Sequence, residues 1–142
     1  MKRILQTIFV GLAVCASVTF AQSGKQEDIT DKNQLFNRTD WRIQNINLLV
    51  NKWQTDNQYR LISYETDKLA QLMDIAVKNF TPAKDKDDFI DLTDSIKSLC
   101  SEISQKAVEK KHDDIIEKAN ELFKKYTEFK LSLKETPLEE LQ

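Results

Sequence analysis

The sequence is poor in the residues that break helices and build tight turns. Its 142 residues include two glycines, the second of which is Gly24, and two prolines, Pro82 and Pro137. Two-residue β-hairpin turns depend on glycine, so the chain beyond Gly24 has little hairpin chemistry. This scarcity favours helices over strands.

Cysteine and histidine are also scarce, which limits covalent and metal chemistry. Of the two cysteines, Cys15 lies in an N-terminal apolar run, so Cys100 has no partner for an intramolecular disulfide. We expect Cys100 to be a small buried core residue, because it flanks an apolar stripe. His112 is the single histidine, and a structural zinc site needs about four ligands. We therefore predict no cofactor and no metal, with a non-covalent haem or metal site at His112 as the alternative. A haem held by histidine and methionine without covalent links would need His112 and Met73 to face one another.

Motifs of catalysis are missing too. A single histidine gives no motif evidence for a serine–histidine–aspartate arrangement, and no glycine-rich phosphate loop is present. A helical enzyme that binds a dianionic substrate would need several buried arginines or lysines. Arg38, Arg42 and Arg60 instead fall off the apolar stripes of their segments. We predict that the protein is not an enzyme.

The first 21 residues have the pattern of a secretory signal peptide. Lys2 and Arg3 precede an apolar run from residue 4 to residue 20, and no second run of this length follows. The pattern predicts cleavage after Ala21, a secreted or periplasmic location, and no membrane association once the signal peptide is removed. Lipid attachment at Cys15 is an alternative, although the bulky Val14 precedes it.

The charge of the chain argues against nucleic-acid binding. The formal net charge is −2 at pH 7, and loss of Lys2 and Arg3 with the signal peptide takes it to −4. Proteins that bind nucleic acids carry basic patches that neutralise phosphates. We expect no nucleic-acid partner, whereas an unknown protein partner is left open and the oligomeric state is not determined.

Four segments have apolar residues at three- and four-residue steps, the pattern of amphipathic helices. The stripes are Ile43, Ile46, Leu49, Val50 and Trp53; Ile62, Leu69, Met73, Ala76 and Phe80; Phe89, Leu92, Ile96, Leu99, Ile103 and Ala107; and Ile115, Ala119, Leu122, Tyr126, Phe129 and Leu133. Pro82 separates the second helix from the third. Residues 55–58 contain neither glycine nor proline, so one long bent helix is an alternative for the first two segments. Asp114 is expected to cap the fourth helix, with Glu117 completing a capping box.

Four stripes of this width bury one another best in an antiparallel four-helix bundle, so the predicted fold class is all-α. The chain is then divided into a signal peptide at 1–21, a flexible leader at 22–34, the bundle at 35–134 and a C-terminal tail at 135–142.

Trp41 and Leu48 are the candidate partner-binding residues. They are seven positions apart and lie nearly opposite the Ile46–Leu49 stripe, so a helix would carry both on its outer side. An exposed apolar pair of this kind suits a protein partner or a second copy of the chain. The alternative is that both residues pack against the leader or a neighbouring helix.

The segment 119–130, ANELFKKYTEFK, resembles the last helix of the cytochrome c′ class of periplasmic c-type cytochromes. In that family the final helix carries Cys-x-x-Cys-His, followed by two residues, an aromatic residue and a basic residue. Phe129 and Lys130 match the closing pair. The resemblance covers about residues 89–130 and implies an exported four-helix bundle.

The haem motif of that family is absent from this chain. Leu122 and Lys125 stand in place of the two cysteines, and Tyr126 stands in place of the haem-ligating histidine. Covalent haem attachment needs those groups, so the resemblance implies a haem-less bundle in which Leu122 and Tyr126 fill the cofactor space. We therefore expect an exported, non-enzymatic helical-bundle protein with a binding or structural role.

Overall fold

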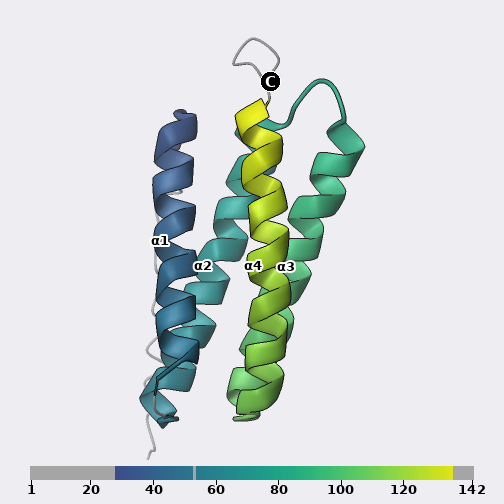
Figure 1. Ribbon diagram of the computed structural model, residues 1–142. Coiled ribbons are helices and arrows are strands. Elements are labelled where there is room, and N and C mark those ends of the chain that lie inside the picture. The colour runs from purple at the N-terminus through teal and green to yellow at the C-terminus, as the bar shows by residue number, and fades with distance from the viewer. Residues whose placement is uncertain (1–27, 53, 136–142) are drawn as a thin grey trace, which may run out of the picture.

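Four helices lie side by side along a common axis and alternate in direction (Figure 1). The computed structural model describes residues 28–52 and 54–135, so the predicted signal peptide, leader residues 22–27, Trp53 and residues 136–142 lie outside the described residues. The helices are α1 (Lys32–Val50), α2 (Asp56–Phe80), α3 (Lys86–Val108) and α4 (His112–Glu135). The predicted all-α four-helix bundle is confirmed.

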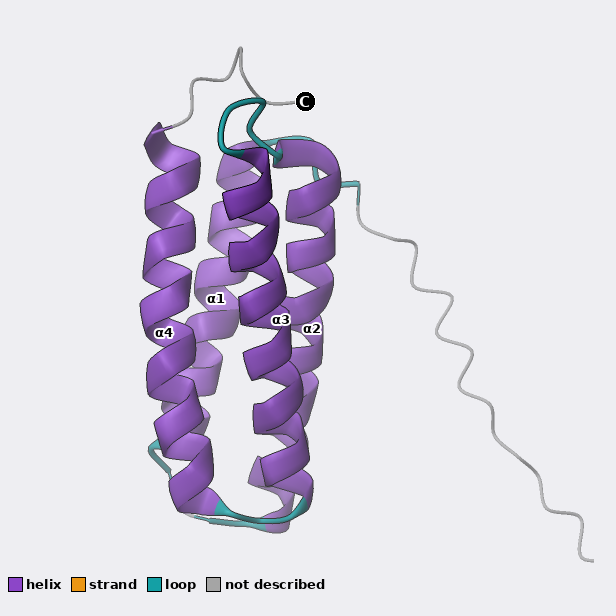
Figure 2. Cartoon of the chain, turned by 90° about the vertical axis from the view of Figure 1, so that its right-hand side faces the viewer, coloured by secondary structure: helices purple, strands orange, loops and turns teal. Residues whose placement is uncertain are grey.

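Each helix packs against its two neighbours around the bundle. α2 contacts α1 and α3, and α4 contacts α3 and α1, with the α1–α4 interface the smallest of the four. The short connections lie at opposite ends of the bundle, with α2–α3 at one end and α1–α2 and α3–α4 at the other (Figure 2). Within the described part of the chain, no helix combines the length and apolar character needed to cross a membrane.

A side-chain cap begins each of the first two helices. The Asp31 carboxylate accepts a hydrogen bond from the Asn33 amide at 2.9 Å, and Thr55 Oγ1 accepts one from the Gln58 amide at 3.2 Å. Each cap satisfies an amide that has no partner within the helix. The Thr55 cap therefore marks the start of a new helix at Asp56, and the alternative of one long bent helix over the first two segments is wrong.

The α3–α4 connection is a tight turn made without glycine. The Lys110 amide donates to the Ala107 carbonyl at 3.1 Å and the Lys111 amide donates to the Lys106 carbonyl at 3.0 Å. Lys110 has φ 56°, the left-handed conformation that usually selects glycine in this Schellman pattern. α4 starts at His112, so Asp114 lies in the first turn and is not the cap that we predicted.

The core is the set of apolar stripes that the sequence predicts. Its largest fully buried side chains are Phe89, Phe129, Ile29, Leu35, Ile46, Ile62, Leu69, Met73, Ile96, Ile103, Ile115 and Leu122. Cys100 is 1% exposed, which confirms it as a core residue.

The bundle begins earlier in the chain than residue 35. Ile29 is buried, and the Asn79 side-chain amide donates to its carbonyl at 2.8 Å. α1 starts at Lys32. The packed residues of the bundle therefore begin before the predicted boundary between leader and bundle at residue 35.

Candidate interaction surface

Trp41 and Leu48 lie on the outer side of α1. They are 53% and 56% exposed, although each is a large apolar side chain. The buried residues of α1 are Leu35, Thr39, Ile46 and Val50, on the opposite side of the helix. Neither Trp41 nor Leu48 is packed into the bundle.

Arg42 holds the Trp41 ring in a defined position. Its guanidinium Cζ lies 4.5 Å from the centroid of the Trp41 ring, within the range of a cation–π contact. The same guanidinium donates through Nη1 to Glu65 Oε2 of α2 at 2.9 Å. Because the side chain of Glu65 is 8% exposed, this ion pair is largely shielded from water and anchors Arg42 between the two helices.

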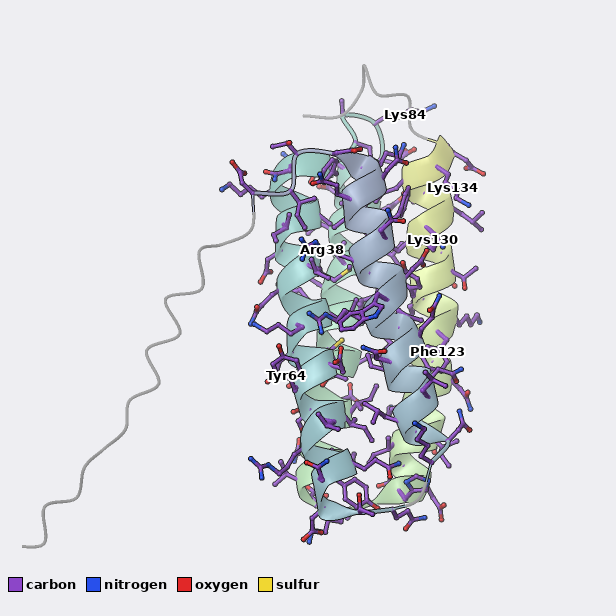
Figure 3. All side chains as sticks on the ribbon, turned by 90° about the vertical axis from the view of Figure 1, so that its left-hand side faces the viewer. Arg38, Tyr64, Lys84, Phe123, Lys130 and Lys134 are labelled. Atoms are coloured by element: carbon purple, nitrogen blue, oxygen red, sulfur yellow. The ribbon has the colours of Figure 1, made fainter. Side chains whose placement is uncertain are left out.

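Tyr64 extends the arrangement onto α2. Its ring centroid lies 5.7 Å from the Arg42 guanidinium and 5.7 Å from the Lys68 ammonium. Tyr64 and Leu61, one turn apart, are 46% and 41% exposed. We call this surface the α1–α2 face, defined by Trp41, Arg42, Leu48, Leu61, Tyr64 and Lys68; Figure 3 looks onto α1 from this side and labels Tyr64 on α2.

Sequence reasoning located two of the six residues of this face. It identified Trp41 and Leu48 but missed Arg42, Leu61, Tyr64 and Lys68. The sequence could have identified Tyr64 as an exposed aromatic residue. It lies off the apolar stripe of α2, just as Trp41 lies off the apolar stripe of α1. The contact of both rings with one arginine depends on the pairing of α1 with α2, which the spacing within each helix does not specify.

A second polar arrangement joins α1 to α4. Tyr126 Oη donates to Asp40 Oδ1 at 2.7 Å and lies 2.7 Å from Thr39 Oγ1. Lys130 Nζ donates to both Asp40 oxygens at 2.8 Å. Burial raises the pKa of Tyr126 above its ordinary value, so this residue stays a neutral hydrogen-bond donor. All four groups have partners, which suits a structural contact between the helices.

The predicted positions of Leu122 and Tyr126 are both buried. Leu122 is fully buried and Tyr126 is 4% exposed. The Tyr126 ring stacks on Phe129 with centroids 5.9 Å apart. Side chains therefore occupy this part of the bundle interior.

His112 lies at the start of α4 and faces Tyr59. The two rings meet edge to face with centroids 6.4 Å apart, and His112 Nδ1 is buried without a hydrogen bond to any described residue. Met73 is fourteen positions beyond Tyr59 on α2, about 21 Å along the helix axis. His112 and Met73 are therefore too far apart to ligate one iron. Among residues 28–52 and 54–135, no group of three or more histidine, cysteine, aspartate or glutamate side chains could hold a metal ion.

An open groove of about 320 Å³ runs between α2 and α3. Its lining residues are Asp67, Ala70, Lys97, Cys100, Ser101, Ser104, Gln105 and Val108. Burial, with a smaller contribution from Asp67, raises the pKa of the Cys100 thiol to about 12. Because the thiolate is the nucleophile, Cys100 is unsuited to thiol chemistry near neutral pH.

Comparison of the chain with protein-family models, with curated proteins and with solved structures found no match. The resemblance to cytochrome c′ in residues 89–130 stays a prediction from the sequence.

Proposed function

We propose that this chain is a secreted or periplasmic binding protein, not an enzyme, that recognises a protein partner through the α1–α2 face. From the resemblance to cytochrome c′ the proposal takes a bundle fold without haem, and it takes no catalytic or redox activity. The supporting observation is that Trp41 is 53% exposed while Arg42, which lies against its ring, is tied to the buried Glu65.

An exposed aromatic ring held in this way is suited to binding. Tryptophan, tyrosine and arginine are the residue types that most often dominate the energy of protein interfaces. A side chain that is already ordered loses less conformational entropy when a partner binds. Trp41, Tyr64 and Arg42 combine both properties on one face of the bundle.

The other polar sites offer less for function. The groups of the Tyr126–Asp40 arrangement bond to one another, and Cys100 has a raised pKa. Neither gives a nucleophile beside a base, which enzymatic group transfer needs. These features support a binding role over a catalytic one.

Site-specific photo-crosslinking in the cell that produces the protein tests the proposal. Tyr64 is replaced by p-benzoylphenylalanine, which keeps an aromatic ring at the centre of the face. The matched control carries the same group at Leu131, which is 52% exposed on α4. We expect a discrete adduct with another protein from position 64 and none from position 131. Equal yields from both positions, or no adduct from position 64, would contradict a binding role for this face.

A second copy of the chain is the alternative partner. Self-association predicts a crosslinked adduct of twice the monomer mass. It also predicts that the mass of wild type in solution rises with protein concentration, whereas Trp41→Ala keeps the mass of a monomer. Light scattering of wild type and Trp41→Ala separates this outcome from a different partner.

A further inference from the structure

Three of the five acidic side chains of α1 and α2 form ion pairs with lysines of α3, α4 or the turn between them. Asp40, the single acid of α1, binds Lys130 of α4. On α2, Asp56 pairs with Lys110 and Asp74 pairs with Lys97, both at 2.7 Å. The two remaining acids of α2 are Glu65, which is buried against Arg42, and Asp67, which lines the α2–α3 groove.

Basic side chains, in contrast, lie along the face. Arg60, Tyr64 and Lys68 are spaced four residues apart on α2, so they form one row on the helix surface. Lys68 Nζ donates to the neutral Gln71 side chain at 3.2 Å and so keeps its net charge. Arg60 and Lys68 therefore bring positive charge to the face, on a chain whose formal net charge is −2.

We infer that the partner docks on the α1–α2 face through an acidic segment of polypeptide that also carries apolar side chains. This inference rests on the proposed function and specifies the chemistry of its partner. Carboxylates of the segment would meet Arg60 and Lys68. Its apolar side chains would cover Trp41, Leu48 and Leu61, which together expose large apolar surface. Complementary charge of this kind speeds encounter and selects among partners.

Two other occupants fit the face less well. Binding to an anionic membrane typically uses clusters of four to eight basic residues, and Arg42 is already neutralised by Glu65. A two-fold contact between copies would place the same face against itself. Positive charge would then oppose positive charge across the contact.

Titration of the isotope-labelled chain with three synthetic peptides, followed by NMR, tests the inference. The first peptide combines glutamate with leucine and phenylalanine, the second replaces every glutamate by lysine, and the third keeps glutamate but replaces the apolar residues by serine. The Trp41 indole signal, assigned with Trp41→Ala, and the Tyr64 amide report binding at the face. Vesicles of phosphatidylglycerol form a fourth arm.

The first peptide is expected to shift both signals. Its dissociation constant should be at least about tenfold lower than that of either other peptide, because the loss of one charged or apolar anchor lowers the affinity by roughly that factor. Lys68→Glu is expected to weaken its binding at least about fivefold. The matched control Lys124→Glu reverses an exposed lysine on α4 and leaves binding unchanged.

Three results would overturn the inference: equal binding of the first and second peptides, no shift with the first peptide, or stronger binding of the vesicles. If crosslinking from position 64 nevertheless traps a protein partner, the face binds and the acidic chemistry alone is wrong. If crosslinking fails as well, the proposed function falls with it.

Discussion

Tyr126 on α4 donates a hydrogen bond to Asp40 on α1 across 2.7 Å, and this contact joins two residues that are 86 positions apart in the sequence. Thr39 lies 2.7 Å from the same hydroxyl. α1 and α4 share the smallest interface of the bundle. A single polar contact therefore contributes more to the specific pairing of α1 with α4 than a similar contact would contribute to the pairing of α2 with α3.

Removal of the Tyr126 hydroxyl is expected to destabilise the bundle. In Tyr126→Phe the ring still fills its place, but Asp40 loses one donor and Thr39 loses a buried partner. The free energy of unfolding should fall by about 1–2 kcal/mol. Urea denaturation followed by circular dichroism measures the change. Tyr64→Phe, an exposed counterpart, should shift the midpoint by much less; equal shifts would contradict a structural role for the Tyr126 contact.

Asp40 makes part of the stability dependent on pH. Burial raises the pKa of its carboxyl, but hydrogen bonds from Lys130 and Tyr126 together with nearby positive charge outweigh burial and lower it below the ordinary value. When folding lowers the pKa of a carboxyl group, its full contribution to stability is present at pH values above its pKa in the unfolded state, which is about 4 for aspartate. That contribution is lost as the pH falls through the pKa of the folded state. Asp40→Asn should therefore reduce stability at pH 7 by about 1 kcal/mol and by less at pH 3.

Urea midpoints at pH 7 and pH 3 for wild type, Asp40→Asn and the control Asp91→Asn, which alters an exposed acid of α3, measure this difference. A loss in Asp40→Asn that is the same at both pH values would show that the carboxylate charge is irrelevant.

The ion pair between Arg42 and Glu65 is expected to be strongly coupled. Arg42→Ala leaves a carboxylate that is 8% exposed without its partner, which should cost about 3 kcal/mol. Glu65→Gln alone should lower the free energy of unfolding by less. The double variant should lose about 1–3 kcal/mol less than the sum of the losses in the two single variants. A double-mutant cycle in urea gives this coupling, and additive losses would argue against a direct interaction.

The Lys110 turn offers a stabilising substitution. A non-glycine residue at φ 56° is disfavoured by contact between its Cβ and the backbone. Lys110→Gly should raise Tm by about 3 °C, since the exposed pair with Asp56 that it removes contributes little. Lys111→Gly, at the next position, should lower Tm. A lower Tm for Lys110→Gly in differential scanning calorimetry would contradict this account of the turn.

The fold was largely predictable because periodicity within one helix is a local property. The stripes from Ile62 to Phe80 and from Phe89 to Ala107 specify which sides of α2 and α3 are buried, and the same spacing places Trp41 and Leu48 outside the core. The packing of Ile29 could not be predicted from the stripe of α1, because it depends on α2 through Asn79. The position of Asp114 was misjudged because the Lys110 turn uses backbone hydrogen bonds, which carry no strong sequence signal.

The candidate face was predictable only in part. The Arg42–Glu65 pair and the shared contact of Arg42 with Trp41 and Tyr64 arise from the alignment of two helices. Loop length and core packing determine that alignment, and neither can be read from residue spacing alone. The Tyr126–Asp40 contact is harder still, because it joins the first helix to the last.

The most direct test of the binding role of the α1–α2 face combines the crosslinker at position 64 with Trp41→Ala, at matched expression in the producing cell. Trp41 and position 64 lie on different helices, and removal of the indole takes away the largest exposed ring of the face. The account predicts that the yield of the position-64 adduct falls at least about tenfold, while Leu131→Ala leaves it unchanged. An undiminished yield in Trp41→Ala would contradict the account.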